Sequence, residues 1–120
     1  MESILIVDDD INLCTILQEE LSTVGYAVDF VTDGYKAVES LLQKQAELVL
    51  LDLKMPKKDG FAVLKDMQEQ NIKSKVIVLT AYADVKSAID STKMGASDFI
   101  SKPYDFDELL ITIRRVLQEE

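Results

Sequence analysis

The residues that could carry out chemistry in this chain are aspartates, a threonine and a lysine, and each stands at or directly after the end of an apolar run. In chain order they are Asp8, Asp9, Asp52, Thr80 and Lys102. The chain contains no histidine, which excludes Ser-His-Asp and Cys-His catalysis, histidine zinc sites and phosphohistidine chemistry. Any reaction here must therefore use carboxylate, hydroxyl and ammonium groups.

The three aspartates could form a cation site. If the runs before Asp8 and Asp52 are neighbouring parallel strands, their carboxylates crowd together at one edge of a sheet. Two like charges about 5 Å apart repel by roughly 3 kcal/mol at an effective dielectric near 20, so such a cluster attracts a cation. Carboxylates and a main-chain carbonyl such as that of Lys54 favour Mg²⁺ (or Mn²⁺) over a complete calcium cage. We expect a metal site formed by Asp8, Asp9, Asp52 and Lys54.

A carboxylate beside such a cation can attack a phosphoryl group when a hydroxyl and an ammonium group face it. In this arrangement Asp52 is the nucleophile, while Asp9 and, more remotely, Asp8 hold the metal. Lys102 pairs with the phosphoryl oxygens and Thr80 donates a hydrogen bond. The simpler interpretation of Asp52 alone is a solvated acid that opens a loop, and the other strand ends favour the catalytic interpretation.

The elements that position these residues follow from the spacing of apolar side chains. Apolar and β-branched runs predict strands at residues 3–7, 26–31, 48–52, 75–80 and 97–101. Helical periodicity predicts helices at residues 11–24, 35–44, 61–70 and 85–94, and a last helix that Asp105 opens. This alternation predicts an α/β fold, a doubly wound, five-stranded parallel sheet of flavodoxin-like order 2-1-3-4-5 flanked by five helices. The alternating strand 26–31 is expected at an edge.

The periodicity also predicts which helical side chains face the core. The expected inward residues are Leu13, Ile16, Leu17, Leu21 and Val24 in the first helix, Val38, Leu41 and Leu42 in the second, and Val85, Ala88, Ile89 and Thr92 in the fourth. Cys14 is expected on the flank of its stripe as a small core-edge residue. The fourth stripe is thin for its length, so we expect that helix to be loosely held.

Composition limits the function classes. A chain of 120 residues fits one domain, residues 1–120, and a single cysteine excludes an internal disulfide. The net charge of −9 repels phosphate backbones and anionic lipids, so we expect no direct nucleic-acid or membrane binding. No apolar run approaches the ~20 residues of a membrane span, and we expect a cytoplasmic protein.

Four segments together resemble the signature of a response-regulator receiver domain of two-component signalling, including the chemotaxis-type receivers. They are Ile6-Val7-Asp8-Asp9-Asp10, Leu50-Leu51-Asp52-Leu53-Lys54-Met55-Pro56 with Asp59-Gly60, Val78-Leu79-Thr80-Ala81-Tyr82, and Ser101-Lys102-Pro103-Tyr104. The resemblance covers essentially the whole chain. Residues 79–88 and 94–109 look most like receivers of nitrogen-regulation-type activators, which precede an ATPase domain and regulate transcription.

The resemblance implies a role for each matching position. Asp52 would accept a phosphoryl group from a sensor histidine kinase or phosphotransfer protein, in a Mg²⁺-dependent reaction, and later lose it by hydrolysis. Asp9 and the Lys54 carbonyl would bind the metal directly, and Asp8 through water. Thr80 would be the switch hydroxyl and Lys102 the lysine that grips the phosphate.

Further positions have secondary roles in the family. Phe99 matches an aromatic that turns inward with the switch, although a simple core aromatic is a compatible interpretation. Lys102-Pro103 matches a peptide bond that is usually cis. Tyr82 and Lys54 match positions that tune hydrolysis, and Asp10 is expected to favour the start of a helix.

The resemblance also implies an output surface and partners. We expect the fourth helix, fifth strand and last helix to carry the output or homodimer contact, including Ala88, Lys93, Arg114 and Arg115. A C-terminal ATPase and DNA-binding output domain in a longer protein and a stand-alone receiver both remain open.

Three other function classes fit the sequence less well. An aspartate-nucleophile phosphatase of the haloacid dehalogenase type needs a second acid two residues after the nucleophile, where this chain has Lys54, and a cap insertion for which 120 residues leave no room. A flavin or nucleotide binder on the same fold needs a Gly-rich phosphate loop after the first strand, where none occurs. A phosphorylation-independent interaction module remains open, although the complete set of acids argues against it.

Overall fold

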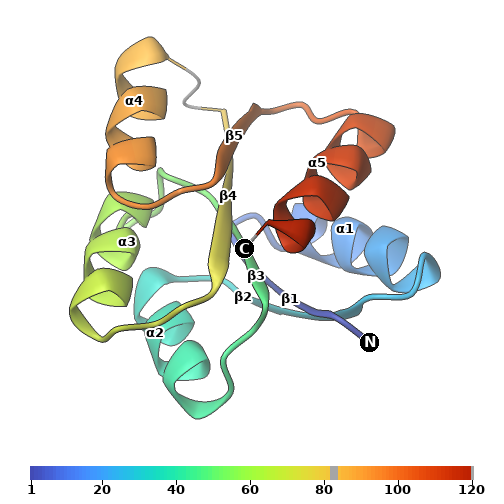
Figure 1. Ribbon diagram of the computed structural model, residues 1–120, viewed down its shortest axis with the longest axis horizontal. Coiled ribbons are helices and arrows are strands. Elements are labelled where there is room, and N and C mark those ends of the chain that lie inside the picture. Colours follow the sequence, from blue (N-terminus) through green and yellow to red (C-terminus); the bar gives the residue numbers. More distant parts are fainter. Residues whose placement is uncertain (82–83, 120) are drawn as a thin grey trace.

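The computed structural model describes residues 1–81 and 84–119 (Figure 1). All strand pairs are parallel, and the sheet has the order β2-β1-β3-β4-β5, which confirms the predicted topology. The strands are β1 (Ser3–Val7), β2 (Ala27–Val31), β3 (Leu48–Leu51), β4 (Lys75–Thr80) and β5 (Asp98–Ser101). The helices are α1 (Ile11–Thr23), α2 (Gly34–Gln43), α3 (Gly60–Glu69), α4 (Val85–Lys93) and α5 (Phe106–Gln118).

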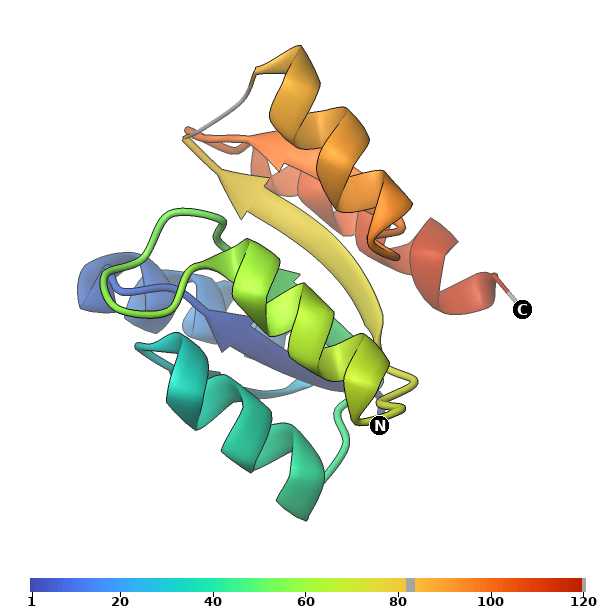
Figure 2. The ribbon, with the colours of Figure 1, turned by 90° about the vertical axis from the view of Figure 1, so that its left-hand side faces the viewer.

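The sheet separates two apolar cores, with α1 and α5 on one face and α2, α3 and α4 on the other (Figures 1 and 2). Side chains alternate between the faces along each central strand. In β1, Ile4 and Ile6 pack toward α1 and α5, whereas Leu5 and Val7 pack toward α2 and α3. Because β1, β3 and β4 are covered on both faces, their sequences are almost continuously apolar. The half-exposed strand β2 lies at an edge, as its alternating sequence predicts.

Every helix begins with an aspartate N-cap whose carboxylate accepts a hydrogen bond from the amide three residues later. The caps are Asp10, Asp33, Asp59, Asp84 and Asp105. Each cap pairs an amide that the first turn of the helix leaves without a partner, and so fixes where the chain turns from loop to helix. Asp10 thus has the helix-starting position that the sequence predicts.

For several residues the prediction that the side chain faces the core is wrong. Ile16 is 58 % exposed and Val24 and Leu42 also face solvent, while Cys14 is fully buried in the core and not at its edge. The reason is that α1 buries the narrow stripe formed by Cys14, Leu17 and Leu21, at spacings of three and four residues. The apolar residues of α1 cover more of the helix surface than this buried stripe, and their spacing does not show which of them contact the sheet.

Helix α4 buries fewer of its residues than its sequence predicts. Val85 is 76 % exposed, and Ile89 and Thr92 are exposed as well, so their predicted inward placement is wrong. Within α4, all of which the structure describes, the buried residue is Ser91, whose hydroxyl donates to the Ala88 carbonyl. The expectation of a loosely held helix is confirmed.

Among the described residues, no helix combines the length and apolarity that a membrane crossing requires.

Candidate functional site

The parallel register places the ends of β1 and β3 side by side. Val7 pairs with Leu51, so the next residue of each strand, Asp8 and Asp52, leaves the sheet at the same edge. The Asp52 amide continues the ladder by donating to the Val7 carbonyl at 2.9 Å. Neighbouring strands are about 4.8 Å apart. The two carboxylates therefore start from adjacent points on the backbone.

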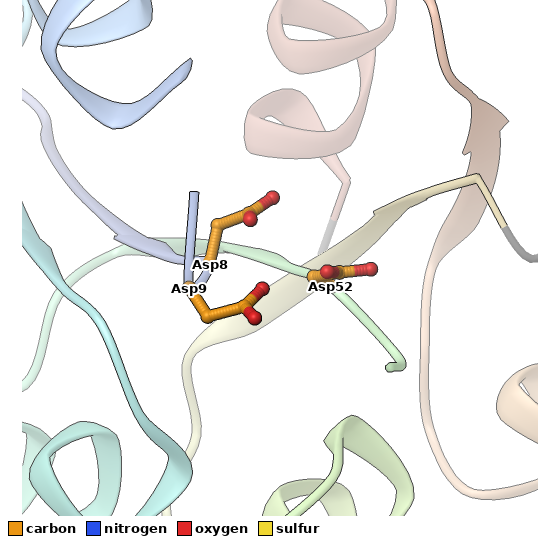
Figure 3. Close-up of side chains that lie close together, drawn as sticks. All are labelled: Asp8, Asp9 and Asp52. Carbon is orange, nitrogen blue, oxygen red and sulfur yellow. The ribbon is translucent and has the colours of Figure 1, made fainter. Parts of the chain in front are cut away.

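The predicted carboxylate cluster is present. Asp8, Asp9 and Asp52 each offer a carboxylate oxygen, and these atoms lie within 4.8 Å of one another. Figure 3 shows the side chains of Asp8 and Asp9, from the end of β1, turned toward the side on which Asp52 lies. Asp8 is 2 % exposed and Asp52 is 6 % exposed, whereas Asp9 is open to solvent. The cluster thus has a buried floor and one exposed carboxylate at its rim.

Lys102 reaches the same cluster from β5. Its Nζ lies 2.6 Å from Asp8 Oδ2 and 3.6 Å from Asp52 Oδ2. The Lys102 amide donates to the Thr80 carbonyl at 2.9 Å, which continues the β4–β5 ladder to the residue that follows β5. The following peptide bond to Pro103 is cis, as predicted. Residues from three separate parts of the chain, Asp8 with Asp9, Asp52 and Lys102, therefore converge at one point.

The electrostatics of this cluster reflect burial opposed by pairing. Burial raises the pKa of Asp8; the hydrogen bonds from Lys102 and from the Asp10 amide lower it, but the net direction is upward. Burial also disfavours the Lys102 ammonium, yet hydrogen bonding and attraction to Asp8 and Asp52 together outweigh it and raise the pKa of Lys102. Lys102 is thus held in its charged form. Burial makes ionisation of the Asp8 carboxylate unfavourable, and a bound cation would reduce this desolvation penalty.

Asp8 also accepts hydrogen bonds from a backbone amide and from a thiol. The Asp10 amide donates to Asp8 Oδ1 at 2.9 Å, and the Cys14 thiol donates to the Asp8 carbonyl at 3.4 Å. Burial, followed by the charges of Asp8 and Asp10, raises the pKa of Cys14 to about 12. A thiol of this kind is unreactive, so Cys14 is a packing residue beneath the site.

The other predicted residues lie around the cluster at different distances from its centre. Thr80 is fully buried at the end of β4, and the half-buried Phe99 lies opposite Val78 on the neighbouring strand β5. Lys54 is exposed, and its amide donates to Asp52 Oδ1 at 3.4 Å. Tyr82 lies outside the described residues. The geometry thus places Thr80 and Lys54 beside the cluster and Phe99 one strand further out.

The residues present fit a hard divalent cation. With all groups ionised, three carboxylates and one ammonium group leave two excess negative charges at the cluster. All the side-chain ligands are oxygens, the set that Mg²⁺ and Mn²⁺ prefer, and the exposed side at Asp9 leaves room for water ligands. The donor set therefore supports the predicted cation site.

Two features of the site are absent from the sequence prediction. One is the direct ion pair of Lys102 with Asp8, because the prediction pairs this lysine with phosphoryl oxygens alone. The other is Gly60, where a Cβ would lie 2.4 Å from the Asp52 carbonyl oxygen. The Asp59-Gly60 pair signals a turn in the sequence, but the close approach of α3 to the backbone of Asp52 appears only in three dimensions.

Comparison with known proteins agrees with this geometry. Residues 4–114 match the family model of the response regulator receiver domain. The transcriptional regulatory protein ZraR of Klebsiella oxytoca is 42 % identical over 114 residues, which are 95 % of this chain and 26 % of ZraR. The chain thus spans about a quarter of the length of this relative.

Solved structures give the same result. The BeF3-activated N-terminal receiver domain of Klebsiella pneumoniae RstA has a TM-score of 0.91 at 30 % identity, covering 98 % of this chain and 100 % of that one. The response regulator TrrA of Thermotoga maritima, solved in complex with Mg(2+)-BeF, has a TM-score of 0.86 at 33 % identity, covering 97 % and 99 %. Receiver domains are signalling switches controlled by phosphorylation. This chain belongs to the family of response-regulator receiver domains.

Proposed function

We propose that Asp52 is the phosphoacceptor of a receiver that takes its phosphoryl group from a sensor histidine kinase or phosphotransfer protein. The observation that carries this proposal is the convergence of Asp8, Asp9, Asp52 and Lys102 at the carboxyl ends of β1, β3 and β5. This cluster then contains a nucleophile, a cation site and an ammonium group that can bind phosphate, all in contact with one another. This arrangement suits phosphoryl transfer, in which catalysis depends mainly on position and charge.

The transfer conserves atoms and electrons in a simple way. A carboxylate oxygen of Asp52 forms a bond to phosphorus while the bond from phosphorus to the donor imidazole nitrogen breaks, and that nitrogen keeps the electron pair. In the hydrolysis that ends the signal, water attacks the phosphoryl phosphorus. The bond from phosphorus to the Asp52 oxygen breaks, and its electrons return to the carboxylate. The proton of the water leaves with inorganic phosphate or passes to solvent. The domain thereby promotes its own phosphorylation and dephosphorylation.

The chain's other residues hold and neutralise the phosphoryl group. Asp8, Asp9, Asp52 and the Lys54 carbonyl would bind Mg²⁺ (or Mn²⁺), which when bound neutralises phosphoryl oxygens. Lys102, already charged and aimed at Asp52, pairs with the remaining oxygen. Thr80, buried at the end of the adjacent strand, supplies the switch hydroxyl, and Phe99 follows it inward.

The output surface follows from the weak attachment of α4. A shift of Thr80 disturbs the chain that leads into α4, and a helix with a single buried residue responds at low cost. The face formed by α4, β5 and α5, with Ala88, Lys93, Arg114 and Arg115, would carry the contact to an output domain or to a second copy. Unchanged amide exchange in α4 between the free form and a phosphoryl-mimic form would contradict this assignment.

The biological setting is proposed from the relatives. Residues 1–120 form one receiver domain, and since ZraR is a transcriptional regulator of which this chain covers a quarter, transcription is the proposed output. The setting is the cytoplasm, where a kinase can reach Asp52. We expect this domain to contact proteins and not nucleic acid or membrane, because its net charge is −9.

Intact-mass spectrometry after incubation with Mg²⁺ and a small acyl phosphate tests the proposal. The wild-type domain should gain the mass of one phosphoryl group, and Asp52→Asn should gain none. Asp59→Asn is the matched control, because Asp59 lies in the same loop but caps α3 through the Ala62 amide. Asp9→Ala should slow the gain through the loss of a metal ligand. Equal phosphorylation of Asp52→Asn and the wild type would place the nucleophile elsewhere.

A further inference from the structure

The loop between β3 and α3, residues 52–59, contains the proposed nucleophile and the carbonyl proposed to bind the metal. Its first part is held by the buried side chain of Met55, and its end is held by the Gly60 amide, which donates to the Leu53 carbonyl at 2.9 Å. Between these points Pro56 and Lys57 are exposed. The far side of the loop therefore needs a contact of its own to stay in place.

Lys58 provides that contact through its side chain. Its Nζ forms an ion pair with Asp66 on α3 and lies 5.0 Å from the ring centroid of Tyr35 on α2. The Lys58 side chain is 15 % exposed, whereas the Asp66 side chain is 31 % exposed and Tyr35 lies at the surface, so the Lys58 ammonium group is the most shielded of the three groups. One ammonium group thus joins the loop to two helices, and we refer to Lys58, Asp66 and Tyr35 as the loop clamp.

The backbone around Lys58 fits this arrangement closely. A Cβ at Gly34, the first residue of α2, would lie 2.6 Å from the Lys58 carbonyl oxygen and 2.8 Å from Lys58 Cγ. Such contacts are tighter than packed atoms tolerate, so the loop rests directly on the start of α2. The position of Lys58 is thereby fixed by both its main chain and its side chain.

The loop also has a turn that its local sequence does not favour. Lys57 has a φ of +70°, and the Lys58 amide donates to the Pro56 carbonyl at 2.8 Å, which defines a γ-turn centred on a residue that is not glycine. A positive φ at such a residue is costly and persists only when the surroundings impose it. The loop clamp follows this turn directly, at the residue whose amide closes it.

We propose that Lys58 is a positioning residue for the phosphorylation site. It holds the γ-turn closed, and so keeps the Lys54 carbonyl and the Asp52 carboxylate in the geometry that the cation requires. The inference rests on the proposed function, because it assigns to the loop clamp the support of that same site. Lys58 itself contacts neither the cation nor the phosphoryl group.

The test compares Lys58→Met with Lys58→Arg. Methionine keeps most of the aliphatic chain but removes the charge that joins Asp66 and Tyr35, whereas arginine keeps the charge. Titration calorimetry with Mg²⁺ should show that Lys58→Met weakens affinity roughly tenfold, the usual effect of losing a group that supports a metal ligand. Lys58→Arg should recover most of it. Asp66→Asn should weaken affinity in the same direction as Lys58→Met.

Two controls separate positioning from other effects. Lys57→Met removes the same charge from the exposed neighbouring residue and should leave Mg²⁺ affinity within about twofold of wild type, the scale of a surface substitution. Amide exchange at residues 53–58 should accelerate in Lys58→Met and stay at the wild-type rate in Lys57→Met. If Lys58→Met has lost its fold by circular dichroism, Asp66→Asn decides the question by the same two measurements.

The outcomes distinguish this inference from the proposed function. Wild-type Mg²⁺ affinity and loop exchange in Lys58→Met or in folded Asp66→Asn would overturn the loop clamp, even if Asp52 is phosphorylated normally. An equal loss in Lys57→Met would also overturn it, because the effect would then be one of net charge. If the wild-type domain accepts no phosphoryl group, the proposed function fails, while the Mg²⁺ comparison still decides the role of Lys58.

Discussion

Replacing Lys102 with methionine should destabilise the protein in a way that Mg²⁺ reverses. At an effective dielectric near 20, the Lys102–Asp8 pair at 2.6 Å attracts by roughly 6 kcal/mol and the Lys102–Asp52 pair at 3.6 Å by roughly 5 kcal/mol. Desolvation of the ammonium group offsets several kcal/mol of this attraction. Removing one partner of a buried ion pair costs 3–5 kcal/mol in general, and we expect about 3 kcal/mol here because Lys102 is slightly open to solvent.

The assay is urea unfolding at pH 7, followed by far-ultraviolet circular dichroism, with and without saturating MgCl₂. The variant should lose about 3 kcal/mol without the metal. With Mg²⁺ it should regain most of this loss, because a divalent cation can neutralise Asp8 and Asp52 in place of the lysine. Lys57→Met, an exposed lysine, should change the free energy of unfolding by less than about 0.5 kcal/mol.

A double-mutant cycle isolates the ion pair. Once Asp8→Asn has removed the paired charge, Lys102→Met should cost much less than it does in the wild type, because the two residues are in direct contact. A loss below about 1 kcal/mol in the single variant would contradict the reasoning, since a surface substitution produces that much. So would a loss that Mg²⁺ leaves unchanged, because the destabilisation would then have another source.

Three further predictions concern residues in the cluster or next to it. Burial raises the pKa of Asp8 above its ordinary value of 3.8, so the wild type loses stability as the pH rises through the shifted pKa; the free energy of unfolding of Asp8→Asn should therefore increase relative to that of the wild type between about pH 3 and pH 7, and a difference that does not change with pH would contradict this. Because the pKa of Cys14 is about 12, only about one thiol in ten thousand is ionised at pH 8, and iodoacetamide should label Cys14 in urea but not in the native protein. Gly60→Ala should lose roughly 1–3 kcal/mol in urea unfolding, because its Cβ would lie 2.4 Å from the Asp52 carbonyl oxygen, and an unchanged unfolding midpoint would refute that close contact.

The sheet and the position of the site could be predicted from the sequence for one physical reason. Strands covered on both faces must be apolar throughout, so β3 and β4 stand out, and the polar residue that ends each must lie at the carboxyl edge. Parallel order then brings Asp8, Asp52 and Lys102 together without any knowledge of side-chain conformation. The topology and the ligand cluster follow from the same pattern.

The inward faces of the helices could not be predicted to the same degree. In α1 the apolar residues span more than the stripe that packs, and Cys14, not Ile16, faces the sheet. In α4 apolar spacing alone gives Val85 and Ile89 as core residues, although the helix meets the rest of the protein through Ser91. Periodicity identifies a helix but does not give the angle at which it lies on the sheet.

Contacts between side chains from separate elements were also beyond sequence reasoning. The ion pair of Lys58 with Asp66 joins a loop to the middle of the next helix, and Tyr35 approaches from another helix. No local pattern distinguishes Lys58 from the exposed Lys57 beside it. The difference arises from the γ-turn, which directs the two lysines to different surroundings.

Chemical trapping decides whether the converging strand ends make Asp52 the site of phosphorylation. The protein is incubated with Mg²⁺ and a small acyl phosphate and then treated with borohydride, which reduces an aspartyl phosphate to homoserine. Peptide mass spectrometry should locate one homoserine, at position 52, in an amount that falls when Mg²⁺ is chelated. Homoserine in place of another aspartate, or a gain of phosphoryl mass with no homoserine at position 52, would show that Asp52 is not the phosphoacceptor.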